Sequence, residues 1–454
     1  MPYVPHTEED IRSMLETIGV NSIDDLFANI PQNVRATELS DTPDGLSEHD
    51  TFTELFTLAE QNSPLTGEVS FLGGGPMRMY RPAVLNTIMM RSEFITSYTP
   101  YQAEISQGLL QAIYEYQTMV SQLLGMDLAN ASSYDGGTAA ADALVVARDN
   151  FRGKRNYVMV AENIHPEYRE IMQTYNIGLE MEWEDVAVLD NGQLDLGAVQ
   201  KQVCKDTAAV FIQYPNRHGV IEDLTDSGLP ATIKKIHDAG ALAVAIVNPI
   251  ACAALRPPGD IGFDMAVAEG QPVSMPIAYG GPFLGIFAVK EHLMRKLPGR
   301  ISGKTLDVDG NEGYILTLQA REQHIRRERA TSNICTNQSL CALAAAVYLS
   351  YYGKAGLPKL ARKIMSLTQY AAKKISALNG YSLLHEGVPH FHELAIKCPI
   401  PAMDVNERLL EEGIQGGLPL ERWGENENHM LLGFSDENSF DQIDDLVAAL
   451  GYIA

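Results

Sequence analysis

Residues 259–274, GDIGFDMAVAEGQPVS, describe a loop, a short buried strand and a turn in close succession. The strand is the run Met265–Ala268, and a run this uniformly apolar is typical of a strand buried on both faces of a sheet. The turn that follows offers four side chains, those of Gln271, Pro272, Val273 and Ser274. It offers no amine, because no lysine occurs between Lys235 and Lys290. A Schiff base therefore cannot form on this turn.

Further apolar, β-branched runs on either side of this strand predict a larger sheet. They are Tyr157–Ala161, Ala208–Gln213, Leu242–Val247 and Phe283–Val289. Helical stretches such as Pro230–Ala239 lie between them. Strands that alternate with helices indicate an α/β fold with a mostly parallel sheet and helices on both faces.

The chain is predicted to have three parts. Residues 1–70 indicate a helical N-terminal arm, because Thr7 can cap a helix that Gly19 ends. Residues 71–335 carry the alternating pattern and form the expected large domain. Residues 336–454 begin with a long apolar helix and then mix helices with strands, which predicts a small C-terminal α+β domain.

Composition excludes several classes of partner. The chain has 454 residues, of which 45% are hydrophobic, so it can bury a large core. Its formal net charge of −24 argues against binding to nucleic acid or to anionic membrane surfaces. The sequence contains neither a transmembrane-length apolar stretch nor the features of a signal peptide at its start. We therefore expect a cytoplasmic protein.

The sharpest local signal is a predicted helix start near residue 99. Thr99, Pro100 and Gln102 form a capping-box pattern, which predicts a helix that begins at Pro100. Tyr98 and Tyr101 flank this cap, where free backbone N–H groups favour an anion. Two interpretations stay open: Thr99 and the two hydroxyls contact an anion, or the rings pack against the protein with satisfied hydroxyls.

A second candidate anion site lies in residues 132–138, SSYDGGT, just before a predicted helix. Glycines at a helix N-terminus let a phosphate approach the backbone, so Gly136, Gly137 and Thr138 are candidate contacts. A plain glycine turn capped by Asp135 or Thr138 explains the pattern equally well.

A basic island occupies residues 319–333, QAREQHIRRERATSN, in an otherwise acidic chain. Arg326 is a candidate contact for a phosphate or a carboxylate. The alternative is a solvated helix face on which Glu322 and Glu328 balance the arginines.

Neither histidines nor cysteines predict a metal site. His390 and His392 alternate on a predicted strand, but further clustered ligands are missing from the sequence around them. The five cysteines lack CxxC spacing, and most are expected to be buried thiols. Cys335 is the one in polar surroundings.

Seven segments carry a resemblance to a known family. They are Phe71–Gly75, Thr96–Glu104, Gln111–Gln117, Ala129–Gly136, Ala268–Pro272, Tyr279–Gly285 and Gln319–Asn337. Together they resemble the P-protein family of the glycine cleavage system, and specifically subunit 1, the alpha half of its two-chain form. The resemblance runs from near the N-terminus to beyond Leu340.

The resemblance implies the fold of pyridoxal-phosphate (PLP) dependent transferases, aminotransferase fold type I. In enzymes of that fold the turn after the buried strand carries the lysine that binds PLP, and an aspartate at the end of another strand faces the pyridine nitrogen. At these positions this chain has Gln271 to Ser274 and Asn248. It is therefore similar to a PLP-fold subunit that does not hold its own cofactor.

The implied activity is that of glycine dehydrogenase (decarboxylating), in which subunit 2, the beta chain, supplies the PLP lysine. Glycine loses its carboxylate as CO2, and its aminomethyl group passes to the lipoyl arm of the H-protein. The T-protein and L-protein are functional partners in the same system. The resemblance implies that Tyr98 and Tyr101 act in the partner's catalytic site and that the chain is inactive alone.

Two alternatives from other classes remain. One is a stand-alone PLP enzyme that uses a lysine elsewhere, such as Lys290 or Lys304. The other is a catalytically inert structural or regulatory pseudoenzyme, whose removal leaves the partner's activity intact.

Overall fold

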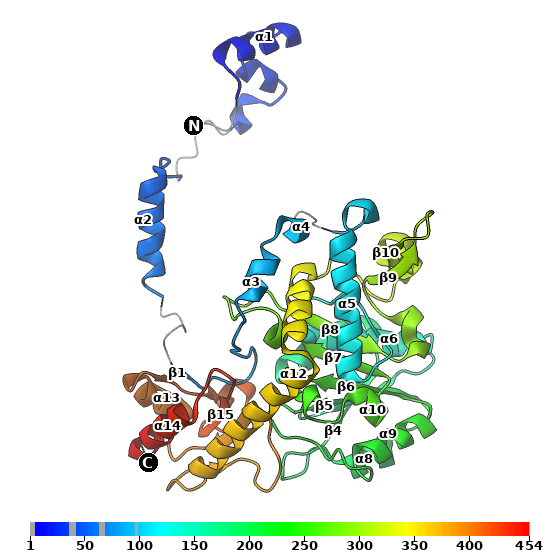
Figure 1. The fold of residues 1–454 in the computed structure, drawn as a ribbon, viewed down its shortest axis with the longest axis vertical. Helices are drawn as coiled ribbons and strands as arrows, with labels where there is room; N and C mark the ends of the chain where they lie inside the picture. Colours follow the sequence, from blue (N-terminus) through cyan, green and yellow to red (C-terminus); the bar gives the residue numbers. More distant parts are fainter. Residues whose placement is uncertain (1–4, 36–41, 63–68, 96–98, 454) are drawn as a thin grey trace. The chain divides into compact units, whose positions relative to one another are not determined.

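The structure is a computed structural model that describes residues 5–35, 42–62, 69–95 and 99–453. It divides into two compact units, Met1–Pro64 and Leu65–Ala454 (Figure 1). The boundaries expected near residues 70 and 335 stay a prediction. Among the described residues, no helix is long and apolar enough to cross a membrane.

The first unit is helical, as predicted. Its helices are α1 (Glu8–Ile18) and α2 (Glu48–Ala59), with short 3-10 turns at Asp24–Phe27 and Gln32–Val34. Thr7 caps α1 in a reciprocal capping box with Asp10, and Gly19 ends the helix at a φ of 85°. The cap at Thr7 and the stop at Gly19 were therefore sufficient to predict α1 from the sequence.

The centre of the second unit is a seven-stranded sheet in the order β2-β8-β7-β6-β5-β3-β4. Its strands are β2 (Leu128–Ala129), β3 (Tyr157–Ala161), β4 (Glu182–Val186), β5 (Thr207–Tyr214), β6 (Leu242–Val247), β7 (Met265–Glu269) and β8 (Gly285–Val289). The strands from β3 to β7 pair in parallel, and β8 is antiparallel to both its neighbours. The mostly parallel α/β fold is confirmed.

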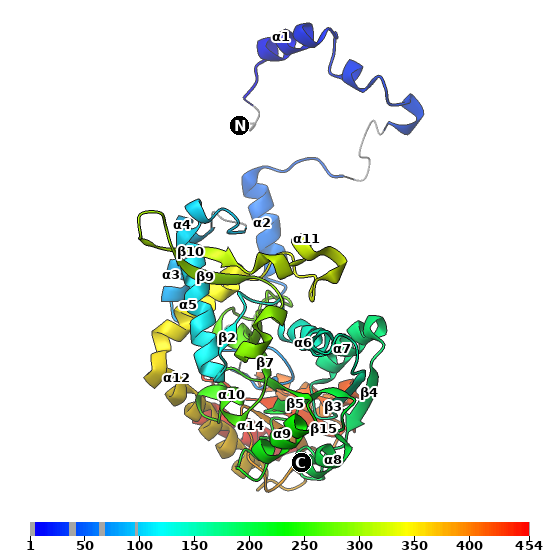
Figure 2. The ribbon, with the colours of Figure 1, turned by 90° about the vertical axis from the view of Figure 1, so that its right-hand side faces the viewer.

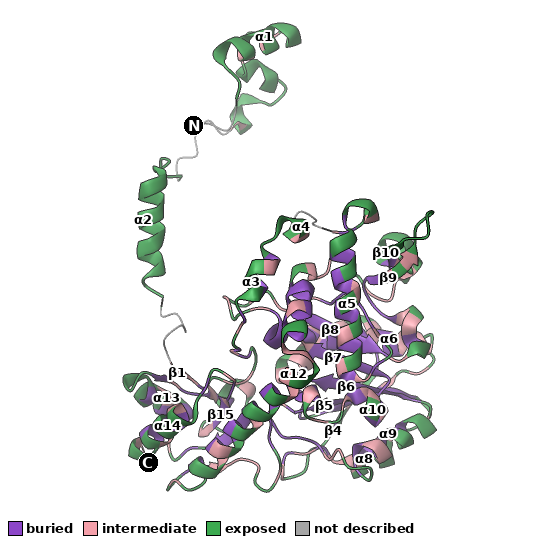
Figure 3. Ribbon diagram, in the orientation of Figure 1, coloured by how far each residue is buried: buried purple, intermediate pink, exposed green. Residues whose placement is uncertain are grey.

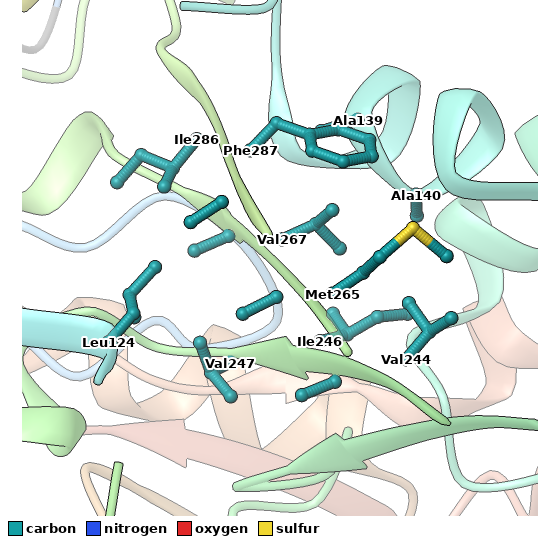
Figure 4. Close-up of a cluster of buried hydrophobic side chains, with 14 of the residues drawn as sticks. Leu124, Ala139, Ala140, Val244, Ile246, Val247, Met265, Val267, Ile286 and Phe287 are labelled. Carbon is teal, nitrogen blue, oxygen red and sulfur yellow. The ribbon is translucent and has the colours of Figure 1, made fainter. Parts of the chain in front are cut away.

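Helices cover both faces of this sheet, with α5 and α12 on one side and α6 and α7 on the other (Figure 2). The helices of this region are α3 (Val84–Met89), α4 (Ser92–Ile95), α5 (Gln107–Leu124), α6 (Gly136–Asn150), α7 (Pro166–Leu179), α8 (Leu196–Gln202), α9 (Leu229–Asp238), α10 (Pro258–Ile261), α11 (Gln323–Arg326) and α12 (Ser339–Ile375). Figure 3 shows that the strands between these layers are buried. Figure 4 shows Ala139 and Ala140 of α6 beside Met265 and Phe287, so small residues let the helix lie close to the sheet.

The C-terminal part is the predicted mixture of helices and strands. After a break in α12 at Gly353, a four-stranded antiparallel sheet contains β11 (Ser382–Leu383), β12 (Glu393–Lys397), β14 (Leu418–Pro419) and β15 (His429–Gly433). Helices α13 (Ala402–Glu411) and α14 (Phe440–Ile453) contribute to its hydrophobic core. Strand β1 (Val69–Ser70) pairs with β13 (Ile414–Gln415), and Phe71 is buried in the same core.

Two local expectations differ from the structure, and one hairpin was not expected. Helix α5 begins at Gln107 rather than at Pro100, after a single 3-10 turn at Ala103–Ile105. The side chain of Gln107 exchanges hydrogen bonds of 2.8 Å with both backbone groups of Tyr314, so a tertiary contact fixes the helix start and overrides the capping-box pattern. Tyr314 belongs to a hairpin that the sequence did not predict, β9 (Ile301–Leu306) and β10 (Glu312–Thr317).

The second correction concerns the histidines. Strand β12 begins at Glu393, so His390 and His392 precede it and do not alternate along it. His392 has a positive φ of 39°, which a regular strand cannot contain.

Candidate functional site

A cavity of about 310 Å³ opens at the carboxyl ends of the parallel strands β5, β6 and β7. Ligand sites of parallel sheets form at this edge, because the loops that follow the strands diverge there. Its lining includes Gln213 after β5, Asn248 after β6, Glu269 at the end of β7, and His165 and Tyr168 after β3. None of these described lining residues is a lysine.

Gln271 cross-links two backbone segments at the position where an amine would be needed. Its side chain is buried, with its Oε1 accepting from the N–H of Met77 at 2.9 Å. Its Nε2 donates to the carbonyl oxygens of Met77 at 3.0 Å and Met275 at 2.9 Å. A lysine could not replace this amide, because an ammonium group cannot accept the bond from Met77.

The carboxylate of Glu269 lies at the N-terminus of α6. Its Oε2 accepts from the N–H of Gly136 at 2.9 Å, and its Oε1 accepts from the N–H groups of Gln271 at 2.8 Å and Leu284 at 2.9 Å. Burial raises the pKa of Glu269 to about 7, while these three bonds act in the opposite direction. A side chain of the chain itself thus takes the first N–H of the predicted anion site.

Close packing explains why glycine occupies positions 136 and 137 at the start of α6. Asp135 caps α6 by accepting from the N–H and the hydroxyl of Thr138, both at 2.7 Å. A Cβ atom on Gly136 would lie 2.2 Å from the Tyr168 hydroxyl, and one on Gly137 would lie 2.6 Å from Ile171. Glycine is therefore required by the close approach of α7, which does not involve a ligand.

Asn248 is engaged with the backbone after β6. Its Oδ1 accepts from the N–H groups of Ile250 at 2.9 Å and Ala251 at 3.2 Å, and its Nδ2 lies 3.4 Å from the sulfur of Met77. The neutral amide of Asn248 accepts the backbone N–H groups of this turn. It has no negative charge with which to pair a protonated pyridine nitrogen.

A second group of titratable residues encloses Gly74 at the cavity wall. Glu393 accepts from the N–H of Gly74 at 2.6 Å. The Nε2 of His165 lies 3.1 Å from the carbonyl oxygen of Gly74. Burial raises the pKa of Glu393 to about 7 and lowers the pKa of His392 to about 3. Burial also lowers the pKa of His165, so burial favours the neutral form of both imidazoles.

Away from the cavity, Tyr101 is half exposed and rests on a buried arginine. Arg300 is 2% exposed, lies 4.7 Å from the Tyr101 ring centre and donates to its hydroxyl oxygen at 2.6 Å. Arg300 also donates to the carbonyl oxygen of Cys335 and lies 3.9 Å from a carboxylate oxygen of Glu322. The Tyr101 hydroxyl keeps its own proton available for a further acceptor.

The other predicted site residues do not form a common site with Tyr101 among the described residues. Tyr98 lies outside the described residues. The Thr99 hydroxyl is buried, and neither a donor nor an acceptor for it is found among the described residues. The basic island is a series of single turns instead of one helix, and Arg326 is exposed at the end of α11. Cys204 and Cys335 are exposed, while the other three cysteines are buried.

The two lysines of the stand-alone alternative lie elsewhere. The Lys290 ammonium group donates to the carbonyl oxygen of Gly125 at 2.8 Å, beyond the far end of β8. Lys304 lies on β9 and pairs with Glu312. Neither of them lines the cavity.

Comparison with known proteins decides the family. A family model described as "Glycine cleavage system P-protein" matches residues 1–450. Two curated relatives, from Bacillus pumilus (strain SAFR-032) and Bacillus cereus (strain AH187), are each named "Probable glycine dehydrogenase (decarboxylating) subunit 1". They are 46% and 44% identical over 99% of this chain and cover 98% and 99% of their own length.

This chain belongs to the glycine cleavage system P-protein family. A solved P-protein structure, described as glycine decarboxylase in inhibitor-bound form, superposes with a TM-score of 0.90 at 38% identity and full coverage of both chains. A NifS-like protein superposes at 0.63 with 14% identity over 85% of this chain and 99% of its own, which supports the fold alone. The PLP-transferase fold expected from the resemblance is confirmed.

The cavity of this P-protein family member does not fit covalently bound PLP. An amine is missing from its lining, Gln271 is fully used in backbone contacts, and Glu269 takes the helix N-terminus where a phosphate would bind. Sequence reasoning found Gln271 and Asn248 but missed Glu269. An acidic residue directly after an apolar strand was the available signal for it.

Proposed function

We propose that the chain is the subunit without the PLP lysine in a two-chain glycine dehydrogenase (decarboxylating) of the glycine cleavage system. A second subunit, the beta chain, holds PLP, which supplies the electron sink for loss of the glycine carboxylate. The aminomethyl group then passes to the lipoyl arm of the H-protein, and the T-protein and L-protein act with it in the same cytoplasmic system.

The observation that carries this proposal is the cavity at residues 269–271. The chain keeps the fold and the pocket position of PLP-dependent enzymes, but amide and carboxylate side chains fill the positions that would bind the cofactor. A chain of this kind contributes to catalysis from its surface. The names of the relatives, which specify subunit 1, support a partner that carries the missing chemistry.

Tyr98 and Tyr101 are the residues we propose for that surface role. The half-exposed Tyr101 hydroxyl accepts from Arg300 and can donate its proton to an anion, such as the substrate carboxylate or the cofactor phosphate in the partner's site. Arg326 is exposed at the end of α11, the helix that also carries His324, whose ring centre lies 6.3 Å from that of Tyr101; it is the proposed cationic contact. Gly136, Gly137 and Thr138 remain weaker candidates for anion contacts, because protein groups already bond the α6 backbone. Thr99 is a weaker candidate because its hydroxyl is buried.

The test is glycine decarboxylation by each chain alone and by the co-expressed pair, with lipoylated H-protein present. We expect activity from the pair and little from either chain alone. Activity of this chain alone with PLP would support the stand-alone alternative. Full activity of the beta chain alone would support an inert structural or regulatory partner.

A further inference from the structure

Three backbone N–H groups from separate segments converge on one carboxylate in the second unit. Gly136 is the first residue of α6, a helix of 15 residues, and Gln271 and Leu284 belong to the turn after β7 and the loop before β8. All three donate to Glu269 at 2.8 to 2.9 Å. Such a ring of N–H donors at a helix N-terminus is the arrangement by which proteins bind phosphate and other oxyanions.

Two opposing effects act on the charge of Glu269. Burial, the larger of the two, raises its pKa to about 7 together with the carboxylate of Asp135, whereas the three N–H donors lower it. The positive end of the α6 dipole adds to these donors. The geometry that links Glu269 to an oxyanion site is therefore the set of three N–H donors, which are groups that also bind free oxyanions.

Packing closes the same position to an external ligand. The hypothetical Cβ of Gly136 would meet the Tyr168 hydroxyl at 2.2 Å and the Glu269 backbone nitrogen at 2.8 Å. The helix start is therefore covered by Tyr168 and by the end of β7. An external phosphate could reach the N–H of Gly136 only if the Glu269 side chain left it.

We propose that Glu269 is an internal ligand, whose carboxylate occupies a preformed oxyanion site at the N-terminus of α6. Removal of the side chain opens this site to a small oxyanion, since the three N–H donors then lack an acceptor and the cavity lies next to them. The inference concerns the pocket of this chain alone, so it does not depend on the activity of the two-chain enzyme.

Chemical rescue of the full-length Glu269→Ala variant tests the proposal. Thermal unfolding and calorimetric titration would be measured with formate, which mimics the lost carboxylate, and with inorganic phosphate. We expect either anion to raise the unfolding midpoint of Glu269→Ala by roughly 2–4 °C near saturation. The same anions should leave the wild-type midpoint unchanged, because Glu269 competes for the site within the chain.

Glu393→Ala is the matched control. Glu393 is a carboxylate that lines the same cavity, but it accepts from one backbone N–H and lies away from a helix N-terminus. We expect little rescue of this variant by phosphate. The proposal is wrong if neither anion stabilises Glu269→Ala, or if both variants are stabilised equally.

A second pair of variants keeps the test decisive if Glu269→Ala does not fold. A glutamine at 269 can accept through one atom only, and its NH2 group would face an N–H donor. A glutamine at 393 can still accept from Gly74. We therefore expect Glu269→Gln to lower the unfolding midpoint more than Glu393→Gln, and equal midpoints would overturn the proposal.

Discussion

The cavity at the carboxyl edge of the sheet and the surface around Tyr101 make opposite use of their polar groups. In the cavity, Gln271 and Glu269 are saturated by backbone contacts within the chain. At the surface, Tyr101 is 52% exposed and its hydroxyl proton is available although Arg300 fixes the ring. The comparison teaches that one fold can use up the polar groups of its own pocket in internal contacts while a hydroxyl at its surface keeps a donor.

The strongest test of the cavity side is whether the isolated chain binds PLP covalently. We expect incubation with PLP, borohydride reduction and peptide mapping to give no single stoichiometric pyridoxyl-lysine, because lysines are absent from the described cavity lining. Scattered substoichiometric labelling is the expected background. One fully labelled lysine, at position 290 or 304 for example, would show that the chain binds PLP covalently on its own and would contradict this prediction.

The surface side is tested by Tyr101→Phe in the assembled enzyme, with Tyr98→Phe in parallel. Loss of one charge-assisted hydrogen bond costs about 1.5–3 kcal/mol, so turnover should fall about 10- to 100-fold if the bond forms in the transition state. Assembly, measured by gel filtration, should survive because the ring is kept.

Tyr351→Phe is the control for this experiment, since Tyr351 is 59% exposed and lies on α12. Turnover should not change in this variant. The packing interpretation of Tyr98 and Tyr101 predicts lower stability with normal turnover, and that result would remove them from the catalytic site.

A pH titration is a second test of the cavity side. Burial raises the pKa of Glu393 from 4.5 to about 7, so the folded protein holds this proton more tightly than the unfolded chain. Its contribution to stability is complete below the unfolded pKa of 4.5 and is lost as the pH rises through about 7. As the pH rises through this window, the free energy of unfolding of Glu393→Gln should therefore increase relative to that of wild type. The expected increase is on the order of 1 kcal/mol per unit of pKa shift.

The gain is read from thermal midpoints of both proteins at several pH values. Glu421→Gln changes an exposed carboxylate in the C-terminal part and serves as the control, for which a flat difference is expected. A flat difference for Glu393→Gln as well would mean that its carboxylate is not desolvated in the folded chain.

The smallest effect is expected from the cysteines, which belong to neither region's chemistry. Replacement of the exposed Cys204 and Cys335 with serine should change stability by no more than about 0.5 kcal/mol. Alanine at the three buried positions should cost stability but leave decarboxylation by the assembled enzyme largely intact. Lost activity at normal assembly would instead point to a thiol in the mechanism.

The strands and helices that the sequence predicted well are those with strong local patterns. Tyr157–Ala161, Leu242–Val247 and the helix capped by Thr7 were predicted with the observed bounds, because uniform burial and capping leave a signal within a few residues. The hairpin β9–β10 was missed, since its residues are half exposed and lack such a pattern.

The candidate site was predictable only where a residue type excludes a chemistry. The missing lysine and Asn248 could be read directly, because an amide cannot form a Schiff base or carry a charge. The partners of Glu269 and Tyr101 could not be read, because Leu284 and Arg300 are brought to them by tertiary packing across the fold.

By itself the sequence determined the α/β fold, the helical arm, the family and the loss of the cofactor amine, since these depend on residue identity and on periodicity along the chain. The tertiary structure alone decided where α5 begins, that Glu269 closes the N-terminus of α6, and that a buried arginine holds Tyr101. The physical reason is that hydrogen bonds between distant segments depend on distances in space, which local patterns do not encode.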